Sequence, residues 1–479
     1  MSELSLKYVK GEVGLINERD KLFEKFKDII DVDLNLDRTL VSFQANKKEP
    51  YYRWFKYKEG FSKRLVYYYL DKYHPSKGHI LDPFAGSGAT LFAAREKGWK
   101  TTGIELLPSG IYNINARLSA ERINYSDFKK ELDKFWMIFD ETIECDKHIN
   151  HIPITKGAFP NDNEENLNRY LTACKKIEND DVRALIEFAA FTVLEDISYT
   201  RKDGQYLRWD YRANRSYSEK EFNKGIISNF LVIIKEKLEE ICNDLDPNPK
   251  LELFLNEESK IKLYDPNIIQ GSSLEILPKL ESEIFDFVLT SPPYCNRYDY
   301  TRTYALELIF LKNNEEDIRN LRQTMLTCTV ENKDKLEYLR NLYNELNRLE
   351  EYNFINNLYF THPAMSEINN TLLLLNNQGI LNNANIPRMV KNYFYEMVFI
   401  IYELYRLLKN GGVIIMVNDN VRYGGEEIPV DLVLSDFAER IGFRIKKIWT
   451  LPVGKGNSSQ QMGEHGRSEL RKCVYVWEK

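Results

Sequence analysis

Thr290-Ser291-Pro292-Pro293-Tyr294 follows the apolar run Ile284-Phe285-Asp286-Phe287-Val288-Leu289, which predicts a buried β-strand. The two prolines have a fixed φ and no N–H group, so their carbonyl oxygens stay outside a regular helix or strand ladder. The stretch is therefore a rigid, acceptor-rich corner beside an aromatic ring. In open α/β sheets, ligands bind at this carboxyl edge of the strands. Acceptors next to a ring suit an exocyclic amino group, whereas the simpler interpretation is a Pro-Pro turn beside a core tyrosine.

A glycine-rich turn lies earlier in the chain. Ile80-Leu81-Asp82-Pro83-Phe84-Ala85-Gly86-Ser87-Gly88-Ala89-Thr90 predicts a short strand, a tight turn and the start of a helix that runs to Lys97. The next strand, Lys100–Glu105, ends in a carboxylate 17 positions after Gly88. An acid at that place can bind ribose hydroxyls. Because the turn lacks the Gly-x-Gly-x-x-Gly spacing, a pyrophosphate is not the favoured ligand.

Together the two motifs resemble those of the amino-methyltransferases of DNA. That family pairs an Asp-Pro-Phe-x-Gly-x-Gly cofactor turn with an (Asp/Asn/Ser)-Pro-Pro-(Tyr/Phe) catalytic corner, and transfers a methyl group from S-adenosylmethionine to adenine N6 or cytosine N4. The form Thr-Ser-Pro-Pro-Tyr is typical of the cytosine-N4 branch, restriction-modification type. The resemblance covers roughly half the chain, about Tyr51–Ala116, Asn267–Phe310 and Tyr395 to the end. It implies a class I methyltransferase α/β fold: a seven-stranded, mostly parallel sheet with one reversed strand and two helical insertions.

The resemblance also implies the residues of the site. Four would bind the target base, with Tyr294 stacking on it: Ser291, Pro292, Pro293 and Tyr294. Nine would bind S-adenosylmethionine: Phe61, Ser62, Asp82, Pro83, Phe84, Gly86, Gly88, Glu105 and Ser272. Ser272 stands where the family usually has an Asp that hydrogen-bonds the adenine amino group, so a weaker, uncharged partner is expected. Cys295 follows Tyr294 rather than a proline, so it is not expected to act as a nucleophile like that of the cytosine-C5 enzymes.

The chain divides accordingly into six parts. They are an N-terminal helical extension (1–46), a cofactor-binding half (47–118), a helical insert that is the candidate target-recognition region (119–265), a catalytic half (266–311), a second helical insert (312–388) and the remainder of the methyltransferase domain (389–479). Helical spacing of apolar residues predicts helices at 17–30, 63–73, 181–197, 222–241, 336–351, 395–408 and 431–441. Strands are predicted at 413–417, 444–450 and 471–477, the last two as an antiparallel pair.

Three polar stretches are candidate DNA contacts. The first is a loop-like stretch, 199–215, with the densest mixture of cations and rings; it supplies Arg201, Lys202, Arg208, Arg212 and Arg215. The second follows the corner and supplies Arg297 and Arg302, for which ion pairing with Asp299 and Glu307 is an equal alternative. The third is the long polar loop before the last strand, with Lys455, Asn457, Gln460 and Arg467. The basic, aromatic stretch 47–58 fits core packing slightly better than nucleic-acid contact.

Composition narrows the remaining options. The 479-residue chain carries a formal net charge of −6, which counts mildly against DNA binding but leaves a local basic face open. Six scattered cysteines without a Cys-x-x-Cys pair, and no recognisable signal peptide, indicate a reducing cytoplasm. Cys145, His148 and His151 match no standard zinc spacing, so no metal is expected. No apolar run has the length of a membrane span.

We therefore expect a site-specific methyltransferase that acts on cytosine N4 in double-stranded DNA by base flipping and direct transfer, with a cognate restriction endonuclease as a separately encoded partner. Adenine N6 methylation uses the same corner and is the nearest alternative. Methylation of an amino group in RNA is a further alternative, because tRNA guanosine N2-methyltransferases share a Pro-Pro-Tyr corner. A catalytically inactive DNA-recognition subunit is the non-enzyme alternative, and the intact Ser291–Tyr294 corner argues against it.

Overall fold

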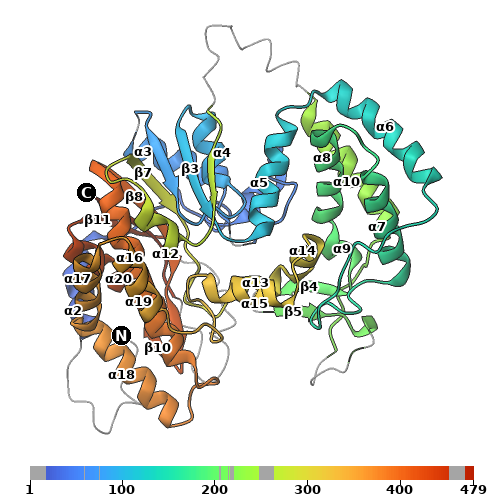
Figure 1. Ribbon diagram of the computed structural model, residues 1–479. Helices are drawn as coiled ribbons and strands as arrows, with labels where there is room; N and C mark the ends of the chain where they lie inside the picture. The colour runs from blue at the N-terminus through green and yellow to red at the C-terminus, as the bar shows by residue number, and fades with distance from the viewer. Residues whose placement is uncertain are drawn as a thin grey trace.

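A computed structural model gives the structure of the protein and describes residues 18–58, 60–74, 76–203, 206–213, 215, 221–246, 264–452 and 470–479. Figure 1 shows two lobes joined by short helices. One lobe holds the large sheet with helices packed on it, and the other consists mainly of helices α6 to α10 of the first insert.

The large sheet has eight strands in the order β1-β11-β12-β8-β7-β2-β3-β6. The strands are β1 (Ile30–Val32), β2 (His79–Asp82), β3 (Lys100–Glu105), β6 (Asn267–Gln270), β7 (Phe285–Thr290), β8 (Leu408–Asp419), β11 (Arg444–Thr450) and β12 (Lys472–Glu478). All neighbours are parallel except that β12 runs antiparallel to both β8 and β11. The predicted fold class, with its reversed strand and C-terminal antiparallel pair, is confirmed. The eighth strand, β1, lies at the edge of the sheet. It has only three residues, which is too short for a recognisable strand pattern in the sequence.

Alternating side chains of the central strands face two different helical layers. Phe287 and Leu289 of β7 pack with α3 (Lys63–Tyr73) and α4 (Ala89–Glu96). Val288 points to the opposite face, where α19 (Ile386–Leu407) and α20 (Val430–Ile441) lie. Because these strands are buried on both faces, their sequences are continuous apolar runs. This burial also leaves the carboxyl ends of the strands as the edge at which polar groups are placed.

The first insert is helical, as predicted, but with two differences. Its elements are α6 (Tyr125–Glu141), α7 (Asn161–Cys174), α8 (Asp180–Thr192), α9 (Leu194–Ile197), β4 (Thr200–Asp203), β5 (Tyr206–Trp209), η3 (Tyr211–Ala213) and α10 (Phe230–Leu245). The helix predicted from residue 222 begins only at Phe230, because the Asn229 side chain accepts hydrogen bonds from Leu231 N and Val232 N in the first turn and caps the helix there. The stretch predicted as a loop contains the antiparallel β4–β5 hairpin.

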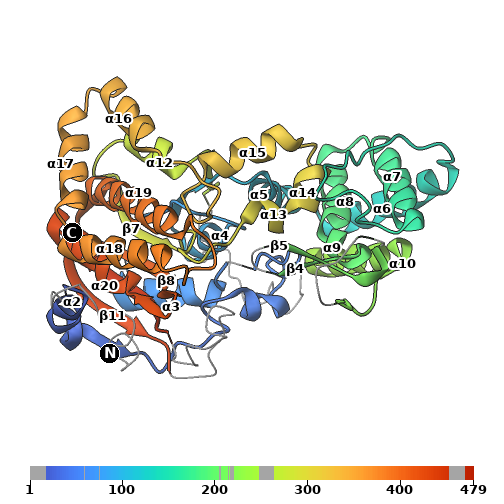
Figure 2. The same cartoon turned by 90° about the horizontal axis from the view of Figure 1, so that it is seen from below.

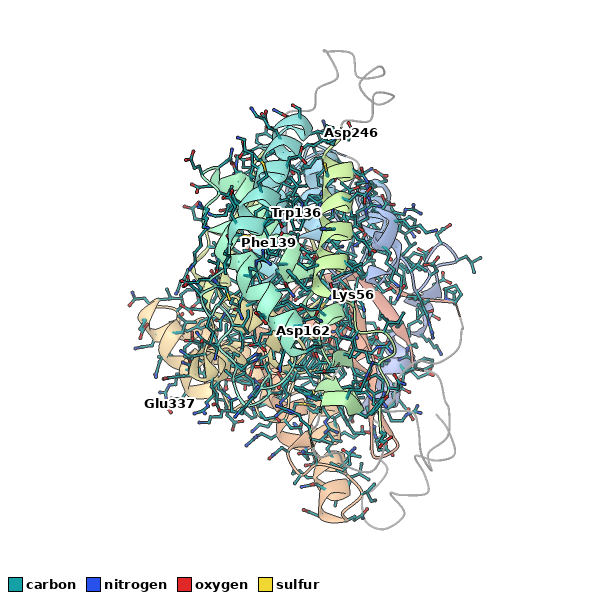
Figure 3. The ribbon with its side chains drawn as sticks, turned by 90° about the vertical axis from the view of Figure 1, so that its right-hand side faces the viewer. Lys56, Trp136, Phe139, Asp162, Asp246 and Glu337 are labelled. Atoms are coloured by element: carbon teal, nitrogen blue, oxygen red, sulfur yellow. The ribbon has the colours of Figure 1, made fainter. Side chains whose placement is uncertain are left out.

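Figure 3 views the outer side of this lobe, with Trp136 and Phe139 labelled on α6. Helix α10 lies against α6, and the Lys235 ammonium sits 5.2 Å from the centroid of the Trp136 ring. The basic, aromatic stretch 47–58 contributes its rings to the core of this lobe, since Trp54 and Phe55 are buried there. Core packing, the slightly favoured interpretation of that stretch, is therefore what the structure has.

The second insert is also helical. It contains α15 (Glu315–Thr324), α16 (Leu336–Glu345), α17 (Leu349–Phe360), α18 (Pro363–Asn377) and the start of α19. The single helix predicted over 336–351 is two helices, because Asn347 takes a left-handed conformation with φ +57° and breaks it. Helix α19 is longer than predicted and passes directly into β8 at Leu408, so the strand begins before the predicted residue 413 and includes Gly411 and Gly412.

The remaining elements connect these layers. They are α2 (Glu18–Phe26), η1 (Lys27–Ile29), η2 (Phe43–Lys48), α5 (Pro108–Ala120), α12 (Ser273–Ile276), η5 (Leu277–Lys279), α13 (Tyr300–Thr303), α14 (Ala305–Phe310), β9 (Val421–Tyr423) and β10 (Glu426–Ile428). Figure 2 shows α13, α14 and α15 bridging the sheet lobe and the first insert. Strand β7 therefore leads, through the corner at Ser291–Tyr294, into the contact between the two lobes.

Candidate active site

The glycine-rich turn lies between β2 and α4, as predicted. Gly86 and Gly88 have φ values of +53° and +81°, a left-handed conformation that favours glycine. A Cβ atom on Gly86 would lie 2.9 Å from the Tyr57 ring, and one on Gly88 would lie 2.9 Å from Ile114. Both glycines are thus required by conformation and by space, and the turn stays open to a ligand on its other side.

Glu105 ends β3 and holds this turn in place. Its carboxylate accepts hydrogen bonds from Gly86 N at 2.6 Å and from Leu107 N at 2.7 Å. Burial raises the pKa of Glu105 to about 7, and the two N–H groups only partly offset that effect. Each oxygen keeps a further lone-pair direction, so the carboxylate can still accept from ribose hydroxyls.

Asp82 ends β2 and contacts both motifs. Its Oδ1 accepts hydrogen bonds from the Thr290 hydroxyl at 2.7 Å and from Phe84 N at 3.1 Å. Burial raises the pKa of Asp82 to about 6. Asp82 therefore orders the cofactor turn and at the same time reaches the strand that carries the catalytic corner.

The corner follows β7 at the carboxyl edge of the sheet. The Ser291 hydroxyl donates a 3.1 Å hydrogen bond to Tyr294 Oη, while Pro292 is buried. The Tyr423 hydroxyl of β9 donates to the Cys295 carbonyl at 2.6 Å and so fixes the exit from the corner. Burial raises the pKa of the Cys295 thiol well above its usual range, which disfavours the thiolate form that a nucleophile requires.

One pocket is shared by the two motifs. It encloses about 780 Å³ of space, part of it open to solvent. Nine of the predicted residues line it: Phe61, Asp82, Pro83, Phe84, Gly86, Glu105, Ser272, Ser291 and Pro293. Four predicted residues do not: Ser62, Gly88, Pro292 and Tyr294. The structure thus brings the cofactor turn and the catalytic corner, distant in sequence, to one cavity.

Ser62, which was predicted to bind the cofactor, does not line this pocket. It is fully buried, its hydroxyl donates to the Leu40 carbonyl at 2.9 Å, and the same oxygen accepts from Leu65 N at 3.3 Å. Ser62 is thus the N-cap of α3. Because both hydrogen bonds of the Ser62 hydroxyl are made within the protein, Ser62 anchors the segment that carries Phe61. The residue of this segment that lines the pocket is Phe61.

Ser272 lines the pocket, but its hydroxyl donates to the Thr324 carbonyl at 3.1 Å. The oxygen therefore retains only its lone pairs for a ligand, as an uncharged acceptor. Thr324 is the last residue of α15, so this hydrogen bond ties the cofactor half of the site to the second insert.

The second insert also supplies part of the pocket wall, which sequence reasoning missed. Met325 and Leu326 line the pocket directly after α15. A buried cluster holds them: Glu396 accepts from Thr327 N at 2.7 Å and pairs with Lys335 Nζ at 3.0 Å. No local sequence signal marks this wall, because its partners are far apart in the chain and meet only in the fold.

The pocket has two further lining residues that local patterns could have indicated. Tyr57 comes from the basic, aromatic stretch and stacks on Tyr304, with ring centroids 5.2 Å apart. Tyr300 follows the corner by six positions and begins α13. Aromatic residues just before the cofactor turn and just after the corner were the available signal.

In the β4–β5 hairpin, successive side chains point to opposite faces, so the candidate DNA contacts of the first insert do not all lie on the same side. Arg201 and Arg208 are directly paired across β4 and β5, and both are exposed. Lys202 points the other way, is only 4% exposed, and pairs with the buried Glu307 at 2.5 Å. We therefore withdraw Lys202 from the candidate DNA contacts, because a buried, neutralised ammonium cannot reach a phosphate.

Arg208 pairs with Asp203 at 3.3 Å, and the remaining candidate cations also have local partners where the structure describes them. Arg212 pairs with Asp210 at 2.6 Å, and Arg215 donates to the carbonyls of Pro153 and Lys156 at 2.8 Å. Arg302 pairs with Asp299 at 3.3 Å, which is one of the ion pairs named as its alternative role, and with Glu331 at 2.8 Å. Arg297 donates to the Asn382 side chain at 2.9 Å. Outside the described residues lie Lys455, Asn457, Gln460 and Arg467.

The part of the chain that the structure describes also bears on other classes of function. No group of three or more His, Cys, Asp or Glu side chains is arranged there to hold a metal ion. His148 contacts the Thr172 hydroxyl at 2.9 Å, and His151 contacts Glu164 at 3.2 Å. Within the same ranges, no helix combines the length and the apolar character that crossing a membrane requires.

A glycine-rich turn and a Ser-Pro-Pro-Tyr corner that share a pocket at the carboxyl edge of this sheet define a class I methyltransferase. The family model for the N6/N4 type, described as DNA methylase, matches residues 16–115. The chain is 46% identical over 461 residues to the type II methyltransferase M.AvaI of Nostoc sp. (strain PCC 7120 / SAG 25.82 / UTEX 2576), and to M.AvaI of Anabaena variabilis, covering 96% of this chain and 92% of each relative. It is 40% identical over 484 residues to the type II methyltransferase M.BsoBI of Geobacillus stearothermophilus, with the same coverage. The chain belongs to this restriction-modification family of N6/N4 DNA methyltransferases.

Proposed function

We propose that this enzyme transfers a methyl group from S-adenosylmethionine to the N4 amino group of a cytosine in duplex DNA. The observation that carries the proposal is the single pocket lined by Gly86 and Glu105 on one side and by Ser291 and Pro293 on the other. That arrangement would put a cofactor site beside an amino-binding corner. Serine in the first position of the corner supports cytosine over adenine as the target.

The residues of the pocket fit S-adenosylmethionine. The turn at Gly86 leaves no room for a Cβ, and Glu105 offers carboxylate oxygens at the place where ribose hydroxyls are expected. Phe61 and Tyr57 supply apolar surface, and Ser272 an uncharged acceptor for an adenine amino group. When bound, the cofactor supplies a methyl group on a sulfonium, and transfer to nitrogen leaves a neutral thioether and releases one amino proton to water.

The corner would act by orientation. The target base must leave the helix to reach it, and the Tyr294 ring would then stack on the base. The Ser291 hydroxyl and the Pro292 carbonyl would accept the two N–H bonds of the amino group, which directs the nitrogen lone pair toward the methyl donor. Such positioning contributes up to roughly 7–11 kcal/mol in favourable systems. Neither a covalent enzyme intermediate nor an activated cysteine is required.

DNA contact would fall mainly on the first insert. The exposed Arg201 and Arg208 of the hairpin are the cations best placed to meet phosphates or base edges there. The polar loop with Lys455 and Arg467 remains a proposed second contact. The relatives carry the name type II methyltransferase, which supports a separately encoded cognate restriction endonuclease as partner and a cytoplasmic location beside the DNA.

The test is chemical identification of the product. The purified protein is incubated with unmodified genomic DNA and S-adenosylmethionine, the DNA is digested to nucleosides, and these are analysed by mass spectrometry. We expect N4-methylcytosine, and none from the Ser291→Ala/Tyr294→Ala variant. N6-methyladenine instead would reassign the target base while keeping the site. Absence of any product on DNA would overturn the proposal and direct the same assay to RNA.

A further inference from the structure

Serine at the first position of the corner can either donate or accept a hydrogen bond, and methyl transfer requires it to accept one from the target amino group. A carboxylate in that position can only accept hydrogen bonds, whereas a hydroxyl has one donor and two lone pairs and can rotate. If the Ser291 proton pointed at the target nitrogen, it would engage the lone pair that has to attack the methyl group. A serine corner therefore needs a second group that takes the hydroxyl proton.

The structure contains such a group within the corner itself. Ser291 Oγ donates to Tyr294 Oη at 3.1 Å, a contact made three residues along the chain. With its proton so directed, Ser291 presents only lone pairs to the pocket that it lines. The acceptor lies on a rigid path, since two prolines separate the partners and the Tyr423 hydroxyl holds the next carbonyl, that of Cys295, at 2.6 Å.

We infer that the Tyr294 hydroxyl is a positioning group that fixes Ser291 as a hydrogen-bond acceptor for the target amino group. The two parts of Tyr294 thus have separate roles. The ring stacks on the target base, and the hydroxyl accepts the Ser291 proton. The pairing also explains how a neutral serine can serve at a position where the corner motif of the family also allows Asp. The inference rests on the proposed function, because it concerns the amino group that the corner would bind.

The decisive variant is Tyr294→Phe, which keeps the ring and removes the hydroxyl. The rate of methyl transfer is measured in a single turnover with radiolabelled S-adenosylmethionine and an oligonucleotide duplex that contains the site, and cofactor and DNA affinities are measured separately. We expect the rate to fall about tenfold, the loss of roughly one hydrogen bond, with both dissociation constants unchanged. An unchanged rate would overturn the inference, as would a loss of affinity that accounts for the whole effect.

A double-mutant cycle shows whether the Tyr294 hydroxyl acts by orienting the Ser291 hydroxyl or in another way. In the Ser291→Ala background there is no hydroxyl to orient, so Tyr294→Phe should cost no further rate. In the Ser291→Asp background the carboxylate accepts without help, so the same change should again be without effect. A tenfold loss that persists in either background would show that the tyrosine hydroxyl acts in another way. Tyr338→Phe, an exposed tyrosine of the second insert, is the matched control.

Failure of the proposed function gives a different pattern. If the unaltered enzyme forms no methylated cytosine or adenine, the corner does not bind an amino group of DNA and the proposed function is wrong. If the unaltered enzyme is active on either base and Tyr294→Phe equals it, only the inference about the Tyr294 hydroxyl is wrong.

Discussion

The Thr290 hydroxyl donates a 2.7 Å hydrogen bond to Asp82 Oδ1, and both side chains are buried. Thr290 is the last residue of β7 and Asp82 the last of β2, and these strands are neighbours in the sheet. The bond therefore joins the residue before the catalytic corner to the first residue of the cofactor turn. It gives the two halves of the pocket a fixed relative position.

Thr290→Val keeps the shape of the side chain and removes this bond. We expect the free energy of unfolding to fall by about 1–3 kcal/mol, because the buried Asp82 carboxylate loses one of its hydrogen-bond donors. The affinity for S-adenosylmethionine should fall several-fold, since Asp82 then keeps its hydrogen bond from Phe84 N but loses its link to β7. Urea unfolding and calorimetric titration measure the two effects. Thr361→Val, at the exposed end of α17, should change neither, and unaltered stability in Thr290→Val would contradict the assignment.

The buried Glu105 should make stability depend on pH. Burial raises its pKa from 4.5 to about 7, so in that interval the folded state binds the proton more tightly than the unfolded state. This contribution to stability is present below pH 4.5 and is lost as the pH rises through about 7, by at most roughly 3 kcal/mol. Glu105→Gln cannot ionise, so its free energy of unfolding should improve relative to the unaltered protein between pH 4.5 and pH 8.

Urea unfolding at pH 4.5, 6 and 8 measures that difference without cofactor. The exposed Glu337→Gln serves as control and should run parallel to the unaltered protein across the series. A constant offset between Glu105→Gln and the unaltered protein at all three pH values would mean that Glu105 does not titrate in this interval.

The sheet and half of the pocket were predictable because their signals are local. A strand, a glycine turn and a capped helix each depend on residues close in sequence, and Lys63–Tyr73, Lys100–Glu105 and Arg444–Thr450 form as predicted to the residue. Gly86 and Glu105 were recognisable for the same reason. Gly86 lies in the turn directly after β2, and Glu105 is the last residue of β3.

What the sequence could not predict depends on contacts between distant segments. The orientation of Lys202 follows from strand alternation, which a stretch interpreted as a loop does not have. The wall at Met325 and Leu326 depends on Glu396, a residue of another helix. Ser62 was assigned to the pocket by position, but its cap and its bond to Leu40 commit it elsewhere. In each case a tertiary partner decides the role.

The second insert should be necessary for cofactor binding. Glu396→Gln keeps the side-chain shape but weakens the cluster with Lys335 and Thr327 that positions the pocket wall. We expect the dissociation constant for S-adenosylmethionine to rise several-fold. Glu403→Gln is the matched control, because Glu403 is equally buried on the same helix and pairs with Arg348 at 2.7 Å, away from the pocket.

Both variants should lose stability by a similar amount, roughly 1–3 kcal/mol, because each removes the charge from a buried ion pair. Only Glu396→Gln should weaken cofactor binding in calorimetric titration. Equal cofactor affinities in the two variants would show that the wall does not depend on this cluster.

Arg201 and Lys202 provide the sharpest test of the DNA-binding face, because they are adjacent in β4 and point to opposite sides. Arg201→Ala should leave the free energy of unfolding unchanged and weaken DNA binding, reducing the slope of log K against log salt concentration by about one. Lys202→Met should leave that slope unchanged but destabilise the fold by roughly 3–5 kcal/mol, because Glu307 loses its buried partner. Fluorescence anisotropy with a labelled duplex at several salt concentrations, together with urea unfolding, measures both. If Lys202→Met, while still folded, changed the salt slope and Arg201→Ala did not, the hairpin would meet DNA with the opposite face.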